Sequence, residues 1–96
     1  MDLPRNHFKH ALAEGRQQIG LWSTLSSHIT VELLAGAGFD WMLLDMEHSP
    51  NDLESLVCQL QAAQPYSTQA VVRVPWNDAV MLKRVLDIGA QSVLIP

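Results

Sequence analysis

The sequence is poor in cysteine, in basic residues and in long apolar segments. Its single cysteine, Cys58, cannot form an internal disulfide and cannot build a zinc site alone. Lys and Arg number 6 against 10 Asp and Glu and are scattered along the chain, which argues against a nucleic-acid surface. No apolar run approaches the ~20 residues that span a bilayer, and residues 1–18 lack the apolar segment of a signal peptide. We therefore expect a cytoplasmic protein that binds neither nucleic acid nor membranes.

Short apolar runs alternate with segments of helical spacing. The runs are typical of strands buried on both faces, as in parallel sheets, and occupy residues 19–25, 41–44, 70–74 and 92–95. Helices are expected at residues 29–37, 53–63 and 79–86, and a short helix ending at Gly15 precedes the first strand. This alternation predicts a parallel sheet with right-handed crossovers.

Local signals add detail to this arrangement. The segment from Ser49 to Asp52 supplies a cap, a proline for the first helical position and an acid three residues after the cap. Residues 34–45 align without gaps with residues 85–96, and Gly38 matches Gly89. Such repetition of a βα unit favours a barrel over an open sheet.

The carboxyl ends of the predicted strands are where a parallel βα fold binds its ligands. After the second strand come Asp45, Glu47 and His48, the densest polar cluster in the chain. A histidine near carboxylates is suited to act as a general base. Two alternatives remain open: the carboxylates cap the next helix beside a solvated His48, or the three side chains bind a metal.

Arg73 ends the third strand, after an apolar run. A guanidinium delivered there needs a partner, either an anionic or carbonyl oxygen of a ligand or a structural ion pair with Asp45 or Glu47. Trp22, near the end of the first strand, is a candidate wall of a substrate pocket, although aromatic residues in this position are commonly core.

Four segments together resemble one known family. They are IGLW at residues 19–22, ELLAGAGFDW at 32–41, DMEHSPN at 45–51 and VVRVPWND at 71–78. In these segments the chain resembles the HpcH/HpaI aldolases, which include 4-hydroxy-2-oxoheptane-1,7-dioate aldolases of aromatic-compound catabolism. The resemblance implies a TIM (β/α)8 barrel and a lyase that cleaves 4-hydroxy-2-oxo acids to pyruvate and an aldehyde. It also implies a divalent metal, Mg2+, Mn2+ or Co2+, that stabilises the pyruvate enolate.

The resemblance further assigns roles to residues of this chain. His48 corresponds to the catalytic base, which acts through bound water, and Arg73 to the arginine that binds the oxo oxygen of the substrate. Asp87 corresponds to an aspartate that raises the basicity of the histidine. The helix that carries Asp87 is expected to end at the opposite side of the barrel, so Asp45 is the better orienter on sequence geometry alone.

The family takes its metal-binding Glu and Asp, and a substrate-binding Gln, from later strands. We therefore expect residues 1–96 to be the N-terminal half of a single (β/α)8 domain, with an N-terminal helix, about four strands and three connecting helices. The metal ligands are expected outside this chain, the isolated fragment is expected to be inactive, and the full-length protein is expected to be a hexamer. The alternatives are a citrate lyase β-like or malyl-coenzyme A lyase-type enzyme and a non-catalytic half-barrel.

Overall fold

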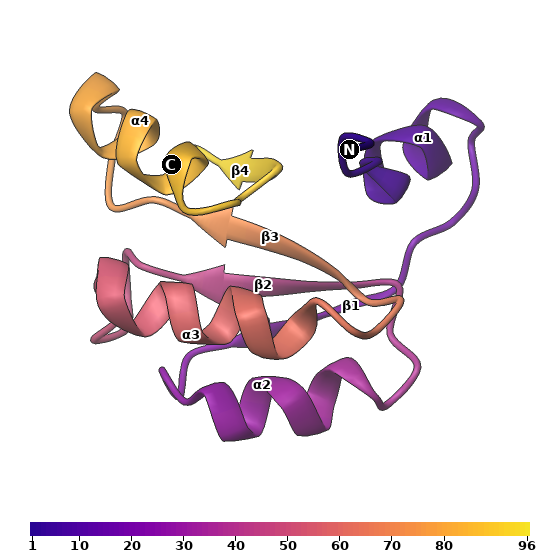
Figure 1. Cartoon of the computed structure of the whole chain (residues 1–96), viewed down its shortest axis with the longest axis horizontal. Coiled ribbons are helices and arrows are strands. Elements are labelled where there is room, and N and C mark those ends of the chain that lie inside the picture. The colour runs from indigo at the N-terminus through magenta and orange to yellow at the C-terminus, as the bar shows by residue number, and fades with distance from the viewer.

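The computed structural model describes all 96 residues as a four-stranded parallel sheet in the order β1-β2-β3-β4, with helices between the strands (Figure 1). The elements are α1 (His7–Ala13), β1 (Gly20–Ser23), α2 (His28–Ala35), β2 (Trp41–Asp45), α3 (Leu53–Ala63), β3 (Gln69–Arg73), α4 (Ala79–Asp87) and β4 (Ser92–Leu94). The expected order of elements is confirmed, with boundaries shifted by about two residues at most. None of the helices has the length and apolar character to cross a bilayer.

The two faces of the sheet differ in chemistry. Met42, Leu44 and Val72 belong to a buried apolar core that also takes side chains from α2, α3 and α4. The helices α2 and α3 lie side by side along one face of the sheet (Figure 1). Because successive side chains of a strand alternate between faces, Asp45 and Arg73 point to the opposite face from this core. In a closed barrel that second face is the inside.

Strand register brings the polar residues of neighbouring strands together. Asp45 pairs with Arg73 at the carboxyl ends of β2 and β3. On β1, Trp22 pairs with Leu43, which lies two residues before Asp45 and therefore on the same face. Three side chains that are distant in sequence thus meet at one edge of the sheet.

The start of α3 differs from the sequence expectation. The helix begins at Leu53, and its cap is Asp52, whose side chain accepts a hydrogen bond from the N–H of Ser55. Ser49 does not cap the helix, and Pro50 is not its first residue. The hydroxyl of Ser49 instead donates to the main-chain oxygen of Asp45, so this segment belongs to the loop that follows β2.

The predicted repeat is visible in the backbone. Gly38 and Gly89, which lie between a helix and the following strand, have φ angles of 98° and 111°. This left-handed region is accessible to glycine at no steric cost, which explains why both βα units use it for the same turn.

The helix α1 closes the amino end of the sheet. Its Phe8 ring packs 5.8 Å from the ring of Trp41, the first residue of β2. Just before the helix, the side chain of Asn6 donates to Ser92 Oγ at 2.9 Å and to the main-chain oxygen of Gln91 at 3.3 Å. The carboxyl ends of the strands, and the polar residues there, lie at the other end.

Candidate active site

Asp45 is the centre of the polar cluster, and its side chain is only 1% exposed. Its carboxylate receives two hydrogen bonds from Arg73, one from Nε at 3.1 Å and one from Nη2 at 2.6 Å. The indole Nε1 of Trp22 donates at 3.2 Å. The backbone N–H groups of Glu47 and His48 donate at 2.8 and 3.2 Å. Five donors from two strands and one loop therefore converge on one carboxylate.

These contacts determine the ionisation of the pair. Burial alone opposes the charged form and raises the pKa of Asp45. The hydrogen bonds from Arg73, from the two backbone N–H groups and from Trp22 outweigh burial and hold that pKa well below its usual range. The hydrogen bond to Asp45 also raises the pKa of Arg73. The two side chains form a fixed ion pair at neutral pH.

Arg73 is held from three sides. Besides its two bonds to Asp45, its Nη1 lies 3.2 Å from Glu47 Oε1, and its Cζ lies 4.9 Å from the centre of the Trp22 ring. The latter distance is typical of a cation–π contact. The side chain is 17% exposed. A guanidinium carries five N–H groups, so some remain available for an oxygen of a ligand.

The imidazole ring of His48 contacts Glu47 and not the carboxylate of Asp45. Its Nε2 lies 3.1 Å from Glu47 Oε1, and its side chain is 71% exposed. Asp45 reaches only the backbone N–H of His48. The expectation that Asp45 orients the His48 ring is therefore corrected: the short, buried Asp45 side chain is taken up by Arg73, whereas the longer Glu47 side chain reaches the ring.

The two remaining candidates, Trp22 and Asp87, lie at opposite ends of the sheet. Trp22 is half-exposed beside Arg73, where its ring is part of the site surface. Asp87 is the exposed last residue of α4, and α4 leads to the start of β4 at the amino end of the sheet. The structure therefore brings together Trp22, Asp45, Arg73 and His48, while Asp87 lies away from them within one chain.

The cluster does not fit a metal ion. No group of three His, Cys, Asp or Glu side chains in the chain is arranged to hold one. The carboxylate of Asp45 is occupied by N–H donors, and Glu47 Oε1 faces both Arg73 and His48. A cation at either carboxylate would displace Arg73.

Sequence reasoning missed a second layer of polar residues behind the cluster. Asn51 Nδ2 donates to the main-chain oxygen of Asp45 at 2.6 Å, and Gln59 Nε2 donates to Asn51 Oδ1 at 2.6 Å. The sequence places Asn51 in a helix cap and in the family-like segment at residues 45–51, and neither indicates a bond to Asp45. The available signal was Gln59, a polar residue between Leu56 and Leu60 on the apolar stripe of α3, because a buried amide needs a partner.

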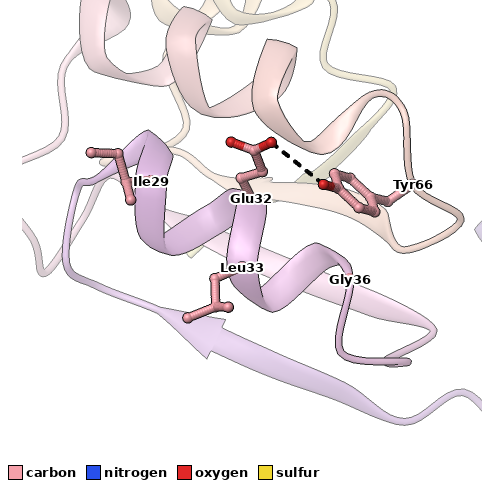
Figure 2. A pocket seen from close by; sticks show the side chains of 5 residues that line it. All are labelled: Ile29, Glu32, Leu33, Gly36 and Tyr66. Atoms are coloured by element: carbon pink, nitrogen blue, oxygen red, sulfur yellow. Dashed lines mark hydrogen bonds between the residues drawn. The ribbon is translucent and has the colours of Figure 1, made fainter.

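A separate pocket lies over α2 and is lined by Ile29, Glu32, Leu33, Gly36 and Tyr66 (Figure 2). The hydroxyl of Tyr66 approaches Glu32 Oε1 at 3.4 Å across it. None of the clustered residues around Arg73 lines this pocket. It is a feature of the outer helical layer and not of the carboxyl edge of the sheet.

Consecutive parallel βα units in the strand order β1-β2-β3-β4, with polar residues at the carboxyl ends of the strands, are typical of the α/β-barrel class. Within this class, the family model described as HpcH/HpaI aldolase/citrate lyase matches residues 18–96. The chain belongs to this family. The resemblance seen in the sequence is thereby confirmed.

The relatives agree with this assignment. The chain is similar to a 4-hydroxy-2-oxo-heptane-1,7-dioate aldolase of Salmonella newport, with 56% identity over 96% of this chain and 35% of the relative. It is also similar to the crystal structure of an HpcH/HpaI aldolase/citrate lyase family protein from Burkholderia cenocepacia, with a TM-score of 0.92 and 40% identity over 96% of this chain and 37% of that one. A crystal structure of a citrate synthase aligns with a TM-score of 0.84 and 28% identity over 92% of this chain and 36% of that one.

The chain spans about a third of the length of the relatives that it matches. The expected fold class is confirmed: the four βα units correspond to part of the TIM barrel of the HpcH/HpaI aldolases. The family model and the relatives carry the names of aldolases and lyases.

Proposed function

We propose that a full-length protein containing this chain is a class II pyruvate aldolase that cleaves 4-hydroxy-2-oxo acids to pyruvate and an aldehyde. The observation that carries the proposal is the position of Arg73 at the carboxyl edge of the sheet. Arg73 donates two hydrogen bonds to Asp45. Glu47 contacts both Arg73 and the ring of His48, so the imidazole lies close to the guanidinium. A fixed guanidinium beside an exposed imidazole supplies an oxygen-binding group and a base.

The chemistry assigned to these residues is a proton transfer and a bond cleavage. His48, acting through a bound water, removes the proton of the 4-hydroxyl group. The bond between C3 and C4 breaks, the aldehyde leaves, and the electron pair passes to the enolate of pyruvate, which is then protonated at C3. The N–H groups of Arg73 that face away from the carboxylates bind the 2-oxo oxygen, where negative charge develops. Trp22 forms the neighbouring wall.

In the proposed mechanism, Asp87 has a role only in an assembly of several subunits. Because it lies at the other end of the sheet from His48 in this chain, its proposed influence on His48 would come from a neighbouring subunit. The proposed full-length assembly is a homo-hexamer. The divalent metal of the proposed enzyme, Mg2+, Mn2+ or Co2+, supplies a positive charge that stabilises an enolate, with ligands from outside residues 1–96.

We propose that residues 1–96 form the N-terminal part of one barrel domain and release no pyruvate alone. The lack of a metal-binding group supports this proposal. So does the outer surface of α2, where Ile29 and Leu33 are 70% and 75% exposed. In the proposed complete barrel, a further helix of the outer ring would cover this surface.

A second candidate is a related carbon–carbon bond reaction of a citrate-type substrate. The family description includes citrate lyase, and a solved citrate synthase shares the fold at 28% identity. The higher identity of 56% to a 4-hydroxy-2-oxo-heptane-1,7-dioate aldolase favours the first candidate.

The test uses a completed barrel, in which this chain replaces the matching N-terminal segment of the Salmonella newport aldolase. We expect it to release pyruvate from 4-hydroxy-2-oxo acids when Mg2+ or Mn2+ is added. General-base assistance contributes ~10²–10⁴ in rate, so His48→Ala should lose cleavage while metal binding persists. His28→Ala, on α2, is the matched control and should retain activity. Unchanged turnover in His48→Ala would remove His48 from its proposed role.

A further inference from the structure

The loop after β2 is tied to α3 by one side chain. Asn51 Nδ2 donates to the main-chain oxygen of Asp45 at 2.6 Å and to Ser49 Oγ at 3.1 Å. On its other side, Asn51 Oδ1 accepts from Gln59 Nε2 at 2.6 Å and from Ser55 Oγ at 3.0 Å. Both ends of the amide are therefore engaged, and its orientation is fixed by its partners.

Gln59 shows that the orientation of Asn51 is supported from the core. Its side chain is fully buried in α3, and its Nε2 also donates to the main-chain oxygen of Ser55 at 3.0 Å. Its Oε1 is buried without a hydrogen-bond partner. A buried, unpaired amide oxygen opposes folding, and an apolar residue would avoid that cost. The contact that Gln59 makes outside its own helix is the one to Asn51.

We propose that Asn51 is a positioning residue for the ion pair of Asp45 and Arg73, with Gln59 holding its amide. By fixing the main chain of Asp45, Asn51 keeps that carboxylate in two-point contact with Arg73 and beneath the N–H groups of Glu47 and His48. A small rotation of the Asp45 backbone would break this arrangement. The consequence for turnover rests on the proposed aldolase function, whereas the structural consequence does not.

The experiment is Asn51→Asp in the completed barrel. This substitution preserves shape but places an oxygen where Nδ2 faces the main-chain oxygen of Asp45. Misplacing a catalytic group by about 1 Å costs ~10²-fold in rate, so we expect kcat to fall roughly 10- to 100-fold while KM changes little. Hydrogen–deuterium exchange should become faster at the amides of Glu47 and His48, which donate to Asp45.

Asp52→Ala is the matched control, because it removes the cap of α3 without touching Asp45. Asp52→Ala should lower the melting temperature of the completed barrel. It should leave kcat, and the protection of the Glu47 and His48 amides from hydrogen exchange, close to the values of the parent barrel, which is the completed barrel without a substitution. If Asn51→Asp does not fold, Asn51→Ala is measured with the same readouts.

The outcomes separate the two proposals. Exchange at the Glu47 and His48 amides no faster in the Asn51 variant than in Asp52→Ala would overturn the positioning role. A kcat loss in Asp52→Ala equal to that in the Asn51 variant would also overturn it. If the parent barrel releases no pyruvate, the proposed function fails, and the exchange measurement still decides the role of Asn51.

Discussion

Replacing Asp45 by asparagine preserves its shape but removes the charge on which five N–H donors converge. Asparagine offers one oxygen acceptor and turns its own N–H groups towards some of those donors. Removing one partner of a buried ion pair costs ~3–5 kcal/mol. Arg73 is 17% exposed, so water compensates in part, and we expect a loss near the lower end, about 3 kcal/mol. In the completed barrel this corresponds to a fall in Tm of roughly 6–12 °C.

The loss of stability caused by Asp45→Asn also depends on pH in a defined way. The pKa of Asp45 is held below its usual range in the folded state, so its contribution to stability is complete above its unfolded value of about 4. That contribution is lost as the pH falls through the folded pKa. The Tm difference between the parent barrel and Asp45→Asn should therefore be constant from about pH 8 to about pH 5 and shrink below about pH 4.

Circular dichroism melts across this pH range measure the stability difference, with Asp2→Asn as control. Asp2 is exposed and has no role in the proposed site, so its substitution should change stability by no more than ~0.5 kcal/mol. Equal melting temperatures for the parent barrel and Asp45→Asn at neutral pH would refute the reasoning. A Tm difference that widens on acidification would refute it as well.

Three further predictions concern the neighbours of Asp45 and the chain alone. In the completed barrel, Trp22→Phe keeps a ring over Arg73 but removes the N–H that reaches Asp45, so thermal melts should show a loss of about 1 kcal/mol; no loss would mean that water replaces this bond. Arg73→Lys should lower kcat more than it raises KM in a pyruvate-release assay, because an ammonium cannot reproduce the planar fork. A purely KM effect would contradict this. The isolated chain should self-associate in size-exclusion chromatography through its open strand edges and the exposed Ile29 and Leu33, and Leu33→Lys should weaken that association. A concentration-independent monomer would refute this prediction.

The order of helices and strands could be predicted because each strand is a short apolar run and each helix a segment of apolar spacing. The meeting of Asp45 with Arg73 could also be anticipated, as one of two alternatives, because both end neighbouring parallel strands. The register confirms that neighbourhood directly. These features depend on apolar periodicity and on the order of the elements, and both can be read directly from the sequence.

Side-chain assignments within the loop after β2 could not be predicted. Asp45 and Glu47 are both two-oxygen acceptors close to His48 in sequence, and spacing does not reveal which one Arg73 will bind at two points. Burial decides the outcome: the enclosed Asp45 accepts two hydrogen bonds from Arg73, and the more exposed Glu47 contacts both Arg73 and the His48 ring. The same applies to Asn51, whose acceptor is a main-chain oxygen that any residue type would offer.

The attachment of α1 to β4 has a consequence for how the chain folds during synthesis. Asn6, beside the first helix, bonds to Ser92 in the last strand, 86 positions later. A ribosome adds ~5–20 residues per second, so the first helix waits roughly 4–17 s before its partner strand has been made. During that interval the Phe8 ring can already pack on Trp41, once β2 has been made. The contact of Asn6 with Ser92 therefore forms only after all the other helices and strands within residues 1–96 have been made.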